Sequence, residues 1–298
     1  MKHQITKYQR SSDEKVDFSL LIPTWNNLPF IQNCLQSIEK NSTQKIQIIV
    51  IVNEGIDGTF AWFTEQKKYD FVYSKENLGI CYAVNICRSL ILSDYIVYAN
   101  DDMYFLPDWD KILYEEIKKT KHNNFMFSAT MIEPEDTGNP CVSVGYYGKT
   151  LEDFQEQKLL SEYKKYIKKD WCGSTWPPLI VHKDIWDLVG GFSIEFSPGM
   201  YSDPDFSMKL YQLGIRHYKG VGASLVYHFG SKSTKRLNKN KGRNIFLMKW
   251  GITAGYFYKN YLNIGIDFTG PVPDQKEKMT FNLINKLKRI IGSYSSKP

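Results

Sequence analysis

The sequence predicts an α/β fold in which a mixed, mostly parallel sheet is flanked by helices. Strand and helix patterns alternate through the first half of the chain, and the strand patterns are short apolar runs that end in turn-rich loops. With 298 residues, of which 42% are hydrophobic, the chain is long enough for one large domain and an appendage. We therefore expect a domain at residues 17–230, after a polar segment at 1–16 and before a basic, helical extension at 231–298.

The first half contains predicted strands and helices in alternation. Apolar runs predict the strands, and apolar residues at helical spacing, with Pro, Asn or Gly in the loops between, predict the helices. Strands are expected at 18–22, 46–52, 71–73 and 95–99, and helices at 29–40, 59–68 and 80–92.

The second half continues with less regular spacing. A charged amphipathic pattern predicts a long surface helix, Gly190 and Gly191 end a short one, and Pro204 suits the first turn of another. Strands are expected at 125–132, 179–182 and 225–228, helices at 151–169, 184–189 and 206–213, and an irregular loop at 171–178.

The net charge of +6 is concentrated in the extension. Residues 231–249 hold no acid and carry the bases Lys232, Lys235, Arg236, Lys239, Lys241, Arg243 and Lys249. A neutral body with charge in one segment argues against nucleic-acid binding, which usually needs a basic face. Three interpretations stay open for this segment: a lid over a diphosphate, contact with an anionic membrane or lipid diphosphate, and a solvated loop. The helical pattern at 283–291 fits interfacial docking or packing onto the domain.

The chain shows neither a secretory signal nor a membrane span. This predicts a cytoplasmic location, with peripheral contact at the membrane face through the basic segment as an alternative. The cysteines are odd in number and lack CxxC spacing, which indicates reduced structural thiols. They are Cys34, Cys81, Cys87, Cys141 and Cys172.

Two adjacent carboxylates, Asp101 and Asp102, follow Asn100 at the end of the predicted strand 95–99. Charged side chains are unfavourable in a strand that is buried on both faces. Open α/β sheets bind ligands at the carboxyl ends of their strands. Carboxylate oxygens hold hard divalent cations there, and the cation holds a phosphorylated ligand. The alternative is a solvated turn or helix cap, because Asn and Asp are common in both.

Neither GxGxxG nor GxxxxGK[ST] occurs, which excludes the usual dinucleotide and P-loop sites. Other short segments occur in a set order. They are SLLIPTWN at 19–26, Glu76-Asn77-Leu78-Gly79 with Asn85, Asn100-Asp101-Asp102, Gly190-Gly191-Phe192, Ser202-Asp203-Pro204-Asp205-Phe206 and Val226-Tyr227-His228-Phe229-Gly230. In this order and spacing they resemble glycosyltransferase family 2, of the Rossmann-like GT-A fold, over most of residues 18–231.

The resemblance implies a divalent metal, Mn²⁺ or Mg²⁺, held by Asp102 with His228 and Asp101. Asn100 replaces the first acid of the family's DxD motif, so it is open whether its amide contacts the ribose or a metal-bound water. His228 has the alternative of a structural histidine at a strand end.

The resemblance also implies a nucleotide-sugar site. Its residues would be Pro23, Thr24, Trp25, Asn26, Asn53, Glu54, Asn77, Gly79, Asn100 and Asp101. Val52 stands where family members usually place an acid that reads the nucleobase, so Asn53 and Asp57 are both candidates for this role. Uridine, guanosine and thymidine diphosphate sugars all stay open as donors.

By resemblance Asp203 is the general base that takes the proton of the acceptor hydroxyl, with simple capping of the following helix as the alternative. Asp205 is expected to cap or orient that helix beside the acceptor. Trp171 and Trp176 are expected to stack acceptor sugars, and burial in the core is the alternative for both.

Together these features predict a metal-dependent, inverting hexosyltransferase that moves a sugar from a nucleoside-diphosphate sugar to a hydroxyl of a glycan or lipid-linked acceptor, in polysaccharide or glycoprotein assembly. A sugar-nucleotide nucleotidyltransferase is disfavoured, because the loop at 23–27 lacks a Gly-rich, Arg-containing sequence. A non-catalytic nucleotide- or glycan-binding module is favoured by Asn100 and Val52. The joint presence of Asp102, Asp203 and His228 counts against it.

Overall fold

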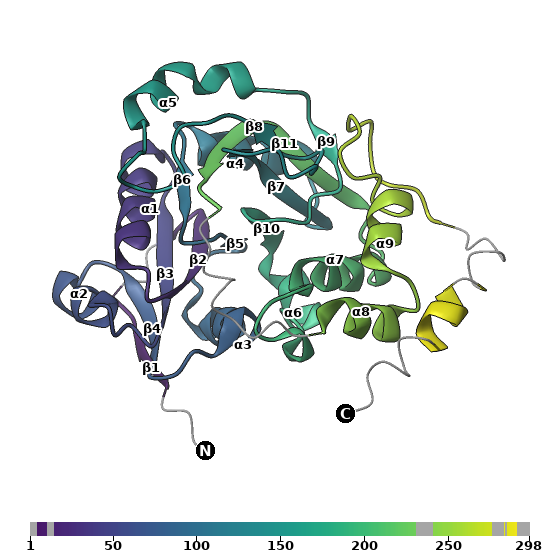
Figure 1. The fold of residues 1–298 in the computed structure, drawn as a ribbon, viewed down its shortest axis with the longest axis horizontal. Helices are drawn as coiled ribbons and strands as arrows, with labels where there is room; N and C mark the ends of the chain where they lie inside the picture. The colour runs from purple at the N-terminus through teal and green to yellow at the C-terminus, as the bar shows by residue number, and fades with distance from the viewer. Residues whose placement is uncertain (1–4, 11–14, 231–240, 276–282, 284, 291–298) are drawn as a thin grey trace.

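The computed structural model describes residues 5–10, 15–230, 241–275, 283 and 285–290. Its centre is an eleven-stranded sheet with helices on both faces (Figure 1). The strands are β1 (Ile5–Tyr8), β2 (Phe18–Trp25), β3 (Ile46–Asn53), β4 (Asp70–Ser74), β5 (Tyr95–Tyr98), β6 (Met103–Phe105), β7 (Phe125–Glu133), β8 (Ser143–Val144), β9 (Trp171–Cys172), β10 (Leu179–His182) and β11 (His217–His228). The α-helices are α1 (Leu28–Asn41), α2 (Thr59–Gln66), α3 (Gly79–Ile86), α4 (Trp109–Thr120), α5 (Glu156–Glu162), α6 (Lys183–Val189), α7 (Ser202–Gln212), α8 (Gly242–Trp250) and α9 (Ala254–Asn260), and short 3-10 helices are η1 (Cys87–Leu90), η2 (Tyr163–Tyr166) and η3 (Ile194–Phe196).

The sheet is mixed, as predicted, with the order β1-β4-β3-β2-β5-β10-β7-β11-β6. Strands β2 to β5 pair in parallel, β7 and β11 pair in parallel, and β10 lies antiparallel between β5 and β7. All the parallel strands therefore run in the same direction. Their carboxyl ends meet at one edge of the sheet, which is where such sheets bind ligands.

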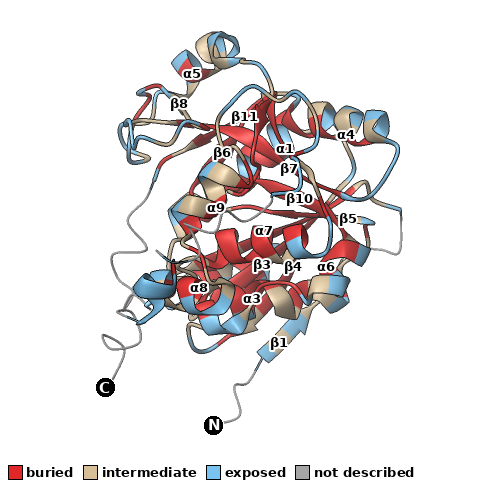
Figure 2. Ribbon diagram, turned by 90° about the vertical axis from the view of Figure 1, so that its right-hand side faces the viewer, coloured by how far each residue is buried: buried red, intermediate tan, exposed pale blue. Residues whose placement is uncertain are grey.

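Both faces of the central strands are buried (Figure 2). In β3, Ile48 and Val50 pack with residues of α1, α2 and α4, whereas Ile49 and Ile51 pack with residues of α3, α6 and α7. Successive strand residues point to opposite faces, so a continuous apolar run serves two cores. Fully burying one such side chain contributes roughly 1.5–3 kcal/mol.

The polar N-terminal segment predicted at 1–16 contributes a strand to the sheet. Within it, β1 pairs antiparallel with β4, and the ring of Tyr8 stacks on Phe71 at 4.2 Å. A four-residue edge strand with alternating partial burial has too weak a local pattern to be read from composition.

The surface helix predicted at 151–169 is shorter in the structure than expected. Its regular part is α5 followed by η2, and Asp153 makes a turn before it by accepting a hydrogen bond from Thr150 N at 2.7 Å. After η2 the chain is extended, and Lys168 N donates to Gly222 O at 3.3 Å. Gly222 belongs to β11 and is 54 residues from Lys168 in sequence. The helix ends before Lys168 because this part of the chain bonds to β11, although the local pattern is amphipathic.

Residues 246–272 of the C-terminal extension pack onto the domain. Phe246 and Ile252, with Phe257 and Leu262 of the α9 region, belong to the same core as the residues of α3, α6 and α7. The bases at 232–239 lie outside the described residues. Within the described ranges, no helix is long and apolar enough to cross a membrane.

Candidate active site

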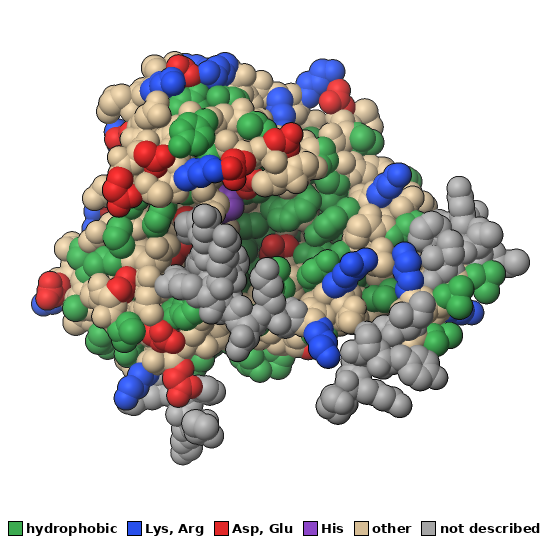
Figure 3. Space-filling model, in the orientation of Figure 1, with side chains coloured by type: hydrophobic (Ala, Val, Ile, Leu, Met, Phe, Trp, Pro, Cys, Tyr) green, Lys and Arg blue, Asp and Glu red, His purple; other side chains and the backbone are tan. Residues whose placement is uncertain are grey.

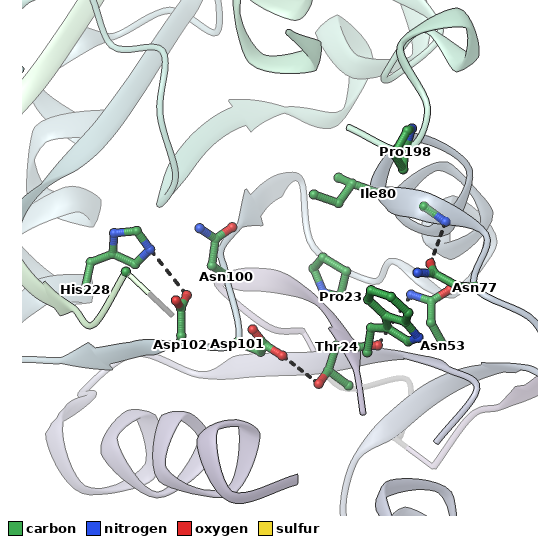
Figure 4. A pocket seen from close by; sticks show the side chains of 13 residues that line it. Pro23, Thr24, Asn53, Asn77, Ile80, Asn100, Asp101, Asp102, Pro198 and His228 are labelled. Carbon is green, nitrogen blue, oxygen red and sulfur yellow. Dashed lines mark hydrogen bonds and ion pairs between the residues drawn. The ribbon is translucent and has the colours of Figure 1, made fainter. Parts of the chain in front are cut away.

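A cleft of about 300 Å³ opens at the carboxyl edge of the sheet (Figure 4). The molecule is hollowed on this face, where acidic side chains and a histidine lie among hydrophobic ones (Figure 3). The lining residues come mainly from strand ends and from the loop before α3. They are Pro23, Thr24, Trp25, Asn53, Asn77, Gly79, Ile80, Asn100, Asp101, Asp102, Pro198, His228 and Gly230.

Asp101 and Asp102 are adjacent in the chain but face different partners (Figure 4). Asp101 Oδ2 accepts hydrogen bonds from Thr24 Oγ1 at 2.7 Å and from Asn27 Nδ2 at 3.1 Å. Burial, followed by the charge of Asp102, raises the pKa of Asp101 to about 7. One oxygen of Asp101 thus ties β2 to the end of β5, and Asp102 is the carboxylate that faces His228.

The ring of His228, at the end of β11, lies between two carboxylates. Its Nε2 is 3.3 Å from Asp102 Oδ1, and its Nδ1 is 2.8 Å from Glu133 Oε1. Burial lowers the pKa of the ring, but the charges and hydrogen bonds of Asp102 and Glu133 outweigh it and raise the pKa to about 10. Because Glu133 accepts at Nδ1, the opposite ring nitrogen is directed at Asp102.

Glu133 is a site residue that the sequence pattern did not single out. It is the last residue of β7, and it lines the cavity that adjoins the cleft. The signal that identifies Asp101 and Asp102 also applies to Glu133, since it is an acid at the carboxyl end of a buried strand.

Asp102 and His228 fit a divalent cation. Neighbouring ligands at 2.0–2.1 Å from an octahedral ion lie about 3 Å from one another. The separation of 3.3 Å between Asp102 Oδ1 and His228 Nε2 is close to that value. Among the described residues, no group of three or more His, Cys, Asp or Glu is arranged to hold a metal.

Asn53 lines the cleft at the end of β3, but its side chain is largely committed to the protein. Its Oδ1 accepts a hydrogen bond from Leu78 N at 3.0 Å, and its Nδ2 donates to Thr24 O at 3.4 Å. This amide therefore links the ends of β2 and β3 to the loop before α3, and it is only 3% exposed.

Asn26, Glu54 and Asp57 hold the neighbouring loop and are not among the residues that line the cleft. Asn26 Nδ2 donates to Glu54 Oε2 at 2.9 Å. Asp57 Oδ2 accepts from Leu28 N at 2.8 Å and its Oδ1 from Thr59 Oγ1 at 2.6 Å. These side chains hold the N-terminal ends of α1 and α2 in place.

Gly79 lets the start of α3 approach the segment before α7. Asn77 Oδ1 accepts a hydrogen bond from Gly79 N at 2.9 Å, and Ile80 N donates to Pro198 O at 2.7 Å. Gly79 has φ +70°, and a Cβ there would lie 2.6 Å from Ser197 Oγ and 2.7 Å from Pro198 Cα. Only glycine fits this position.

Asn85 joins two of the predicted motifs directly. Its Nδ2 donates to Phe192 O at 2.7 Å, and its Oδ1 accepts from Phe192 N at 2.8 Å. A Cβ on Gly191 would lie 2.3 Å from Asn85 Oδ1, so the Gly-Gly-Phe turn must carry glycine here. The pair of hydrogen bonds clamps this turn against α3.

Replacing Asn85 by Ala should lower the free energy of unfolding by about 1–3 kcal/mol, because both polar groups of the Phe192 backbone lose their partner. Urea denaturation measures this change. Asn124→Ala, at an exposed position in the loop before β7, is the matched control and should change stability little. Equal stability of the two variants would contradict a clamping role for Asn85.

A second cavity, of about 650 Å³, adjoins the cleft and contains Asp203. Asn100 and His228 line both spaces. Asp203 lies in the first turn of α7, and its buried Oδ1 has no hydrogen-bond partner among the described residues. Burial raises the pKa of this carboxyl to about 7.

The two tryptophans predicted beside the acceptor have different environments. Trp176 lines the second cavity, where its ring is 5.3 Å from that of Tyr258. Trp171 is 5% exposed, its Nε1 donates to Thr130 Oγ1 at 2.9 Å, and its ring covers Gly220. Burial in the core, the alternative considered for both tryptophans, therefore describes Trp171. Because Trp171 is buried, its ring is not available to stack on an acceptor sugar.

Asp205 is likewise a structural residue and not an acceptor contact. It is fully buried, and its Oδ1 accepts from Trp250 Nε1 at 2.8 Å and pairs with Lys249 Nζ at 2.9 Å. Since both partners belong to α8, Asp205 attaches the extension to α7. Lys249, one of the bases of the predicted basic segment, is thus committed to this contact.

Comparison with known proteins agrees with the geometry. The hyaluronan synthase of Pasteurella multocida is 22% identical over 248 residues, which cover 82% of this chain and 24% of that protein. The chain spans about a quarter of the length of the curated relatives that it matches.

Two solved structures share the fold. TarS 1-349 of S. aureus, in complex with UDP-GlcNAc, has a TM-score of 0.58 at 12% identity and covers 94% of this chain and 73% of its own. The mannosyltransferase PcManGT from Pyrobaculum calidifontis, in complex with GDP-Man and Mn²⁺, has a TM-score of 0.51 at 14% identity, with 95% and 71% covered. The mixed sheet with helices on both faces is thus the GT-A fold.

The family model described as glycosyl transferase family 2 matches residues 19–171, about half of the chain. This region runs from β2 to the end of β7 and on to β9, and it includes the strand ends that carry Asn100, Asp102 and Glu133. The chain belongs to glycosyltransferase family 2.

Proposed function

We propose that the chain is a metal-dependent, inverting glycosyltransferase of the hexosyl type, which transfers a sugar from a nucleoside-diphosphate sugar to a hydroxyl of a glycan or lipid-linked acceptor. The observation that carries the proposal is that Asn100 and His228 line both the cleft with Asp102 and the cavity with Asp203. A donor in the first space and an acceptor in the second would therefore meet at one point.

The donor side of the proposal depends on Asp102 and His228. The nucleotide sugars bound by TarS and PcManGT, and the Mn²⁺ bound by the latter, support a donor of this class and a divalent metal here. Held by Asp102 and His228, Mn²⁺ or Mg²⁺ would offset the negative charge that develops on the departing diphosphate. Glu133, which accepts at His228 Nδ1, would keep the ring in the orientation that such a site needs.

The acceptor side depends on Asp203. Asp203 is partly exposed and lines the second cavity, so its carboxylate could accept the hydrogen of an acceptor hydroxyl. A pKa near 7 suits a general base that works near neutral pH. Attack from the Asp203 cavity on a sugar whose diphosphate lies in the adjoining cleft would invert the anomeric carbon.

The proposed acceptor is a glycan or a lipid-linked saccharide. The relative named hyaluronan synthase supports a glycan acceptor and a setting in polysaccharide assembly. We also propose that the basic C-terminal segment contacts an anionic membrane if the acceptor is lipid-linked.

A panel of uridine, guanosine, thymidine and cytidine diphosphate sugars tests the proposal. We expect hydrolysis of one donor class only with Mn²⁺ or Mg²⁺, and loss of the activity with a chelator. The same panel without protein is the blank, and binding measured by calorimetry separates recognition from turnover. Absence of both binding and hydrolysis across the panel would favour a non-catalytic module on this fold.

A further inference from the structure

A groove of about 580 Å³ extends the cavity that contains Asp203. The groove and the cavity share the lining residues Thr137, Asn139, Trp176, Gly255 and Tyr258, so the two spaces adjoin. Each space is within the range of about 300–1,000 Å³ that is typical of sites for drug-sized ligands. One sugar ring beside Asp203 would therefore leave the groove unfilled.

The walls of the groove have the chemistry of a carbohydrate site. The rings of Trp176 and Tyr258 form its junction with the cavity, at 5.3 Å and an interplanar angle of 53°. Beyond them lie the amide of Asn263 and, as the only charged residue among the groove's lining residues, Lys259. Aromatic rings match the apolar faces of sugars, and amides match their hydroxyls, whereas a diphosphate would need several cations.

The far wall of the groove is held in place by hydrogen bonds to β9. Cys172 N donates to Ile266 O at 2.8 Å, and Gly265 N donates to Cys172 O at 3.1 Å. A Cβ on Gly265 would lie 2.5 Å from the Pro140 side chain, so the two walls touch at this point. A preformed groove costs a ligand little ordering free energy on binding.

We propose that this groove binds the sugar units that follow the glycosylated end of the acceptor, so that the preferred acceptor is an oligosaccharide of at least two units. The inference rests on the proposed function, because it takes the cavity at Asp203 as the place of the reacting hydroxyl. It also gives a role to the C-terminal extension, whose residues Gly255, Tyr258 and Asn263 build one side of the groove.

An array of linear glycans, each series running from the monosaccharide to the hexasaccharide, tests the inference with the full chain. We expect at least one series to bind about tenfold more tightly, and to be used with a correspondingly lower KM, once the chain exceeds one unit. The double variant Lys259→Ala with Ile266→Ser alters two exposed lining residues of the groove and should abolish this dependence on length. Gly255→Trp should do the same by filling the junction, since a side chain there meets open space.

Leu188→Ser combined with Lys119→Ala is the matched control, because both residues are exposed and lie outside the groove. It should keep the length dependence of the wild type. The inference would be overturned if affinity did not depend on glycan length, or if both groove variants kept the length dependence of the wild type. It would also be overturned if no glycan of the array bound to a protein that hydrolyses its donor. Length-dependent glycan binding without hydrolysis of any nucleotide sugar would instead count against the proposed function and leave the groove standing.

Discussion

Replacing Asp203 by Asn should lower the rate of sugar transfer by about 10²–10⁴-fold and leave donor affinity unchanged. The amide keeps the size of the side chain but cannot take the proton of the acceptor hydroxyl. In the wild type, kcat/KM should fall about tenfold per pH unit below the Asp203 pKa of about 7, as the carboxylate becomes protonated. Transfer and donor binding are measured on the same preparations, the former over a pH series.

Asp184→Asn is the matched control, because Asp184 also lies in the first turn of a helix but is exposed. It should leave transfer unchanged. Turnover that persists in Asp203→Asn would assign the base to another group.

The same substitution should affect stability in the opposite direction. Burial raises the pKa of Asp203 in the folded state, so the folded state favours the protonated form. Its contribution to stability is fully present below the unfolded pKa of about 3.9 and is lost as the pH rises through about 7. Asp203→Asn should therefore be more stable than the wild type above pH 7, by urea denaturation, and the difference should vanish in acid.

Replacing Asp102 by Ala should reduce metal-dependent donor binding by more than about 100-fold. Substituting a residue that only orients a ligand typically costs 10–100-fold in metal affinity, and Asp102 is proposed as a ligand itself. Calorimetry of the donor with and without Mn²⁺ measures the effect, and any binding that does not need metal should be the same in both proteins. Unchanged affinity in the presence of Mn²⁺ would remove Asp102 from the metal site.

The substitution Glu133→Gln should have a smaller effect on metal-dependent donor binding than Asp102→Ala. The Glu133 carboxylate is 2.8 Å from His228 Nδ1, so the change should weaken metal-dependent binding by about 10–100-fold. A loss as large as that of Asp102→Ala would indicate that Glu133 contacts the metal.

The fold and the position of the cleft could be predicted because both depend on local patterns. Apolar runs identify strands buried on both faces, and polar residues that follow such runs mark the ligand-binding edge. Pro23, Asn53, Asn77, Asn100 and Asp102 all line the cleft in the structure. Glu133 carries the same signal, although the family motifs did not draw attention to it.

The outcomes that local patterns could not decide involve residues whose partners are distant in sequence. Trp171 and Trp176 are five positions apart, yet one covers Gly220 in the core and the other faces the cavity that contains Asp203. Asp203 and Asp205 are two positions apart, and of the two only Asp205 forms a hydrogen bond and an ion pair with α8.

By itself, the sequence determined an α/β fold with a mixed sheet, the strand ends that carry Asp101 and Asp102, and the family resemblance, because periodicity, turn chemistry and motif order are all local properties. Only the tertiary structure decided which polar residues meet. His228 reaches Glu133 because β11 runs parallel to β7, and it reaches Asp102 because β11 pairs antiparallel with β6, where His228 lies opposite Met103. Asn85 reaches Phe192 across 107 positions. Such contacts depend on strand order and on long-range packing, and the free energy that selects them is distributed over two cores that no single segment encodes.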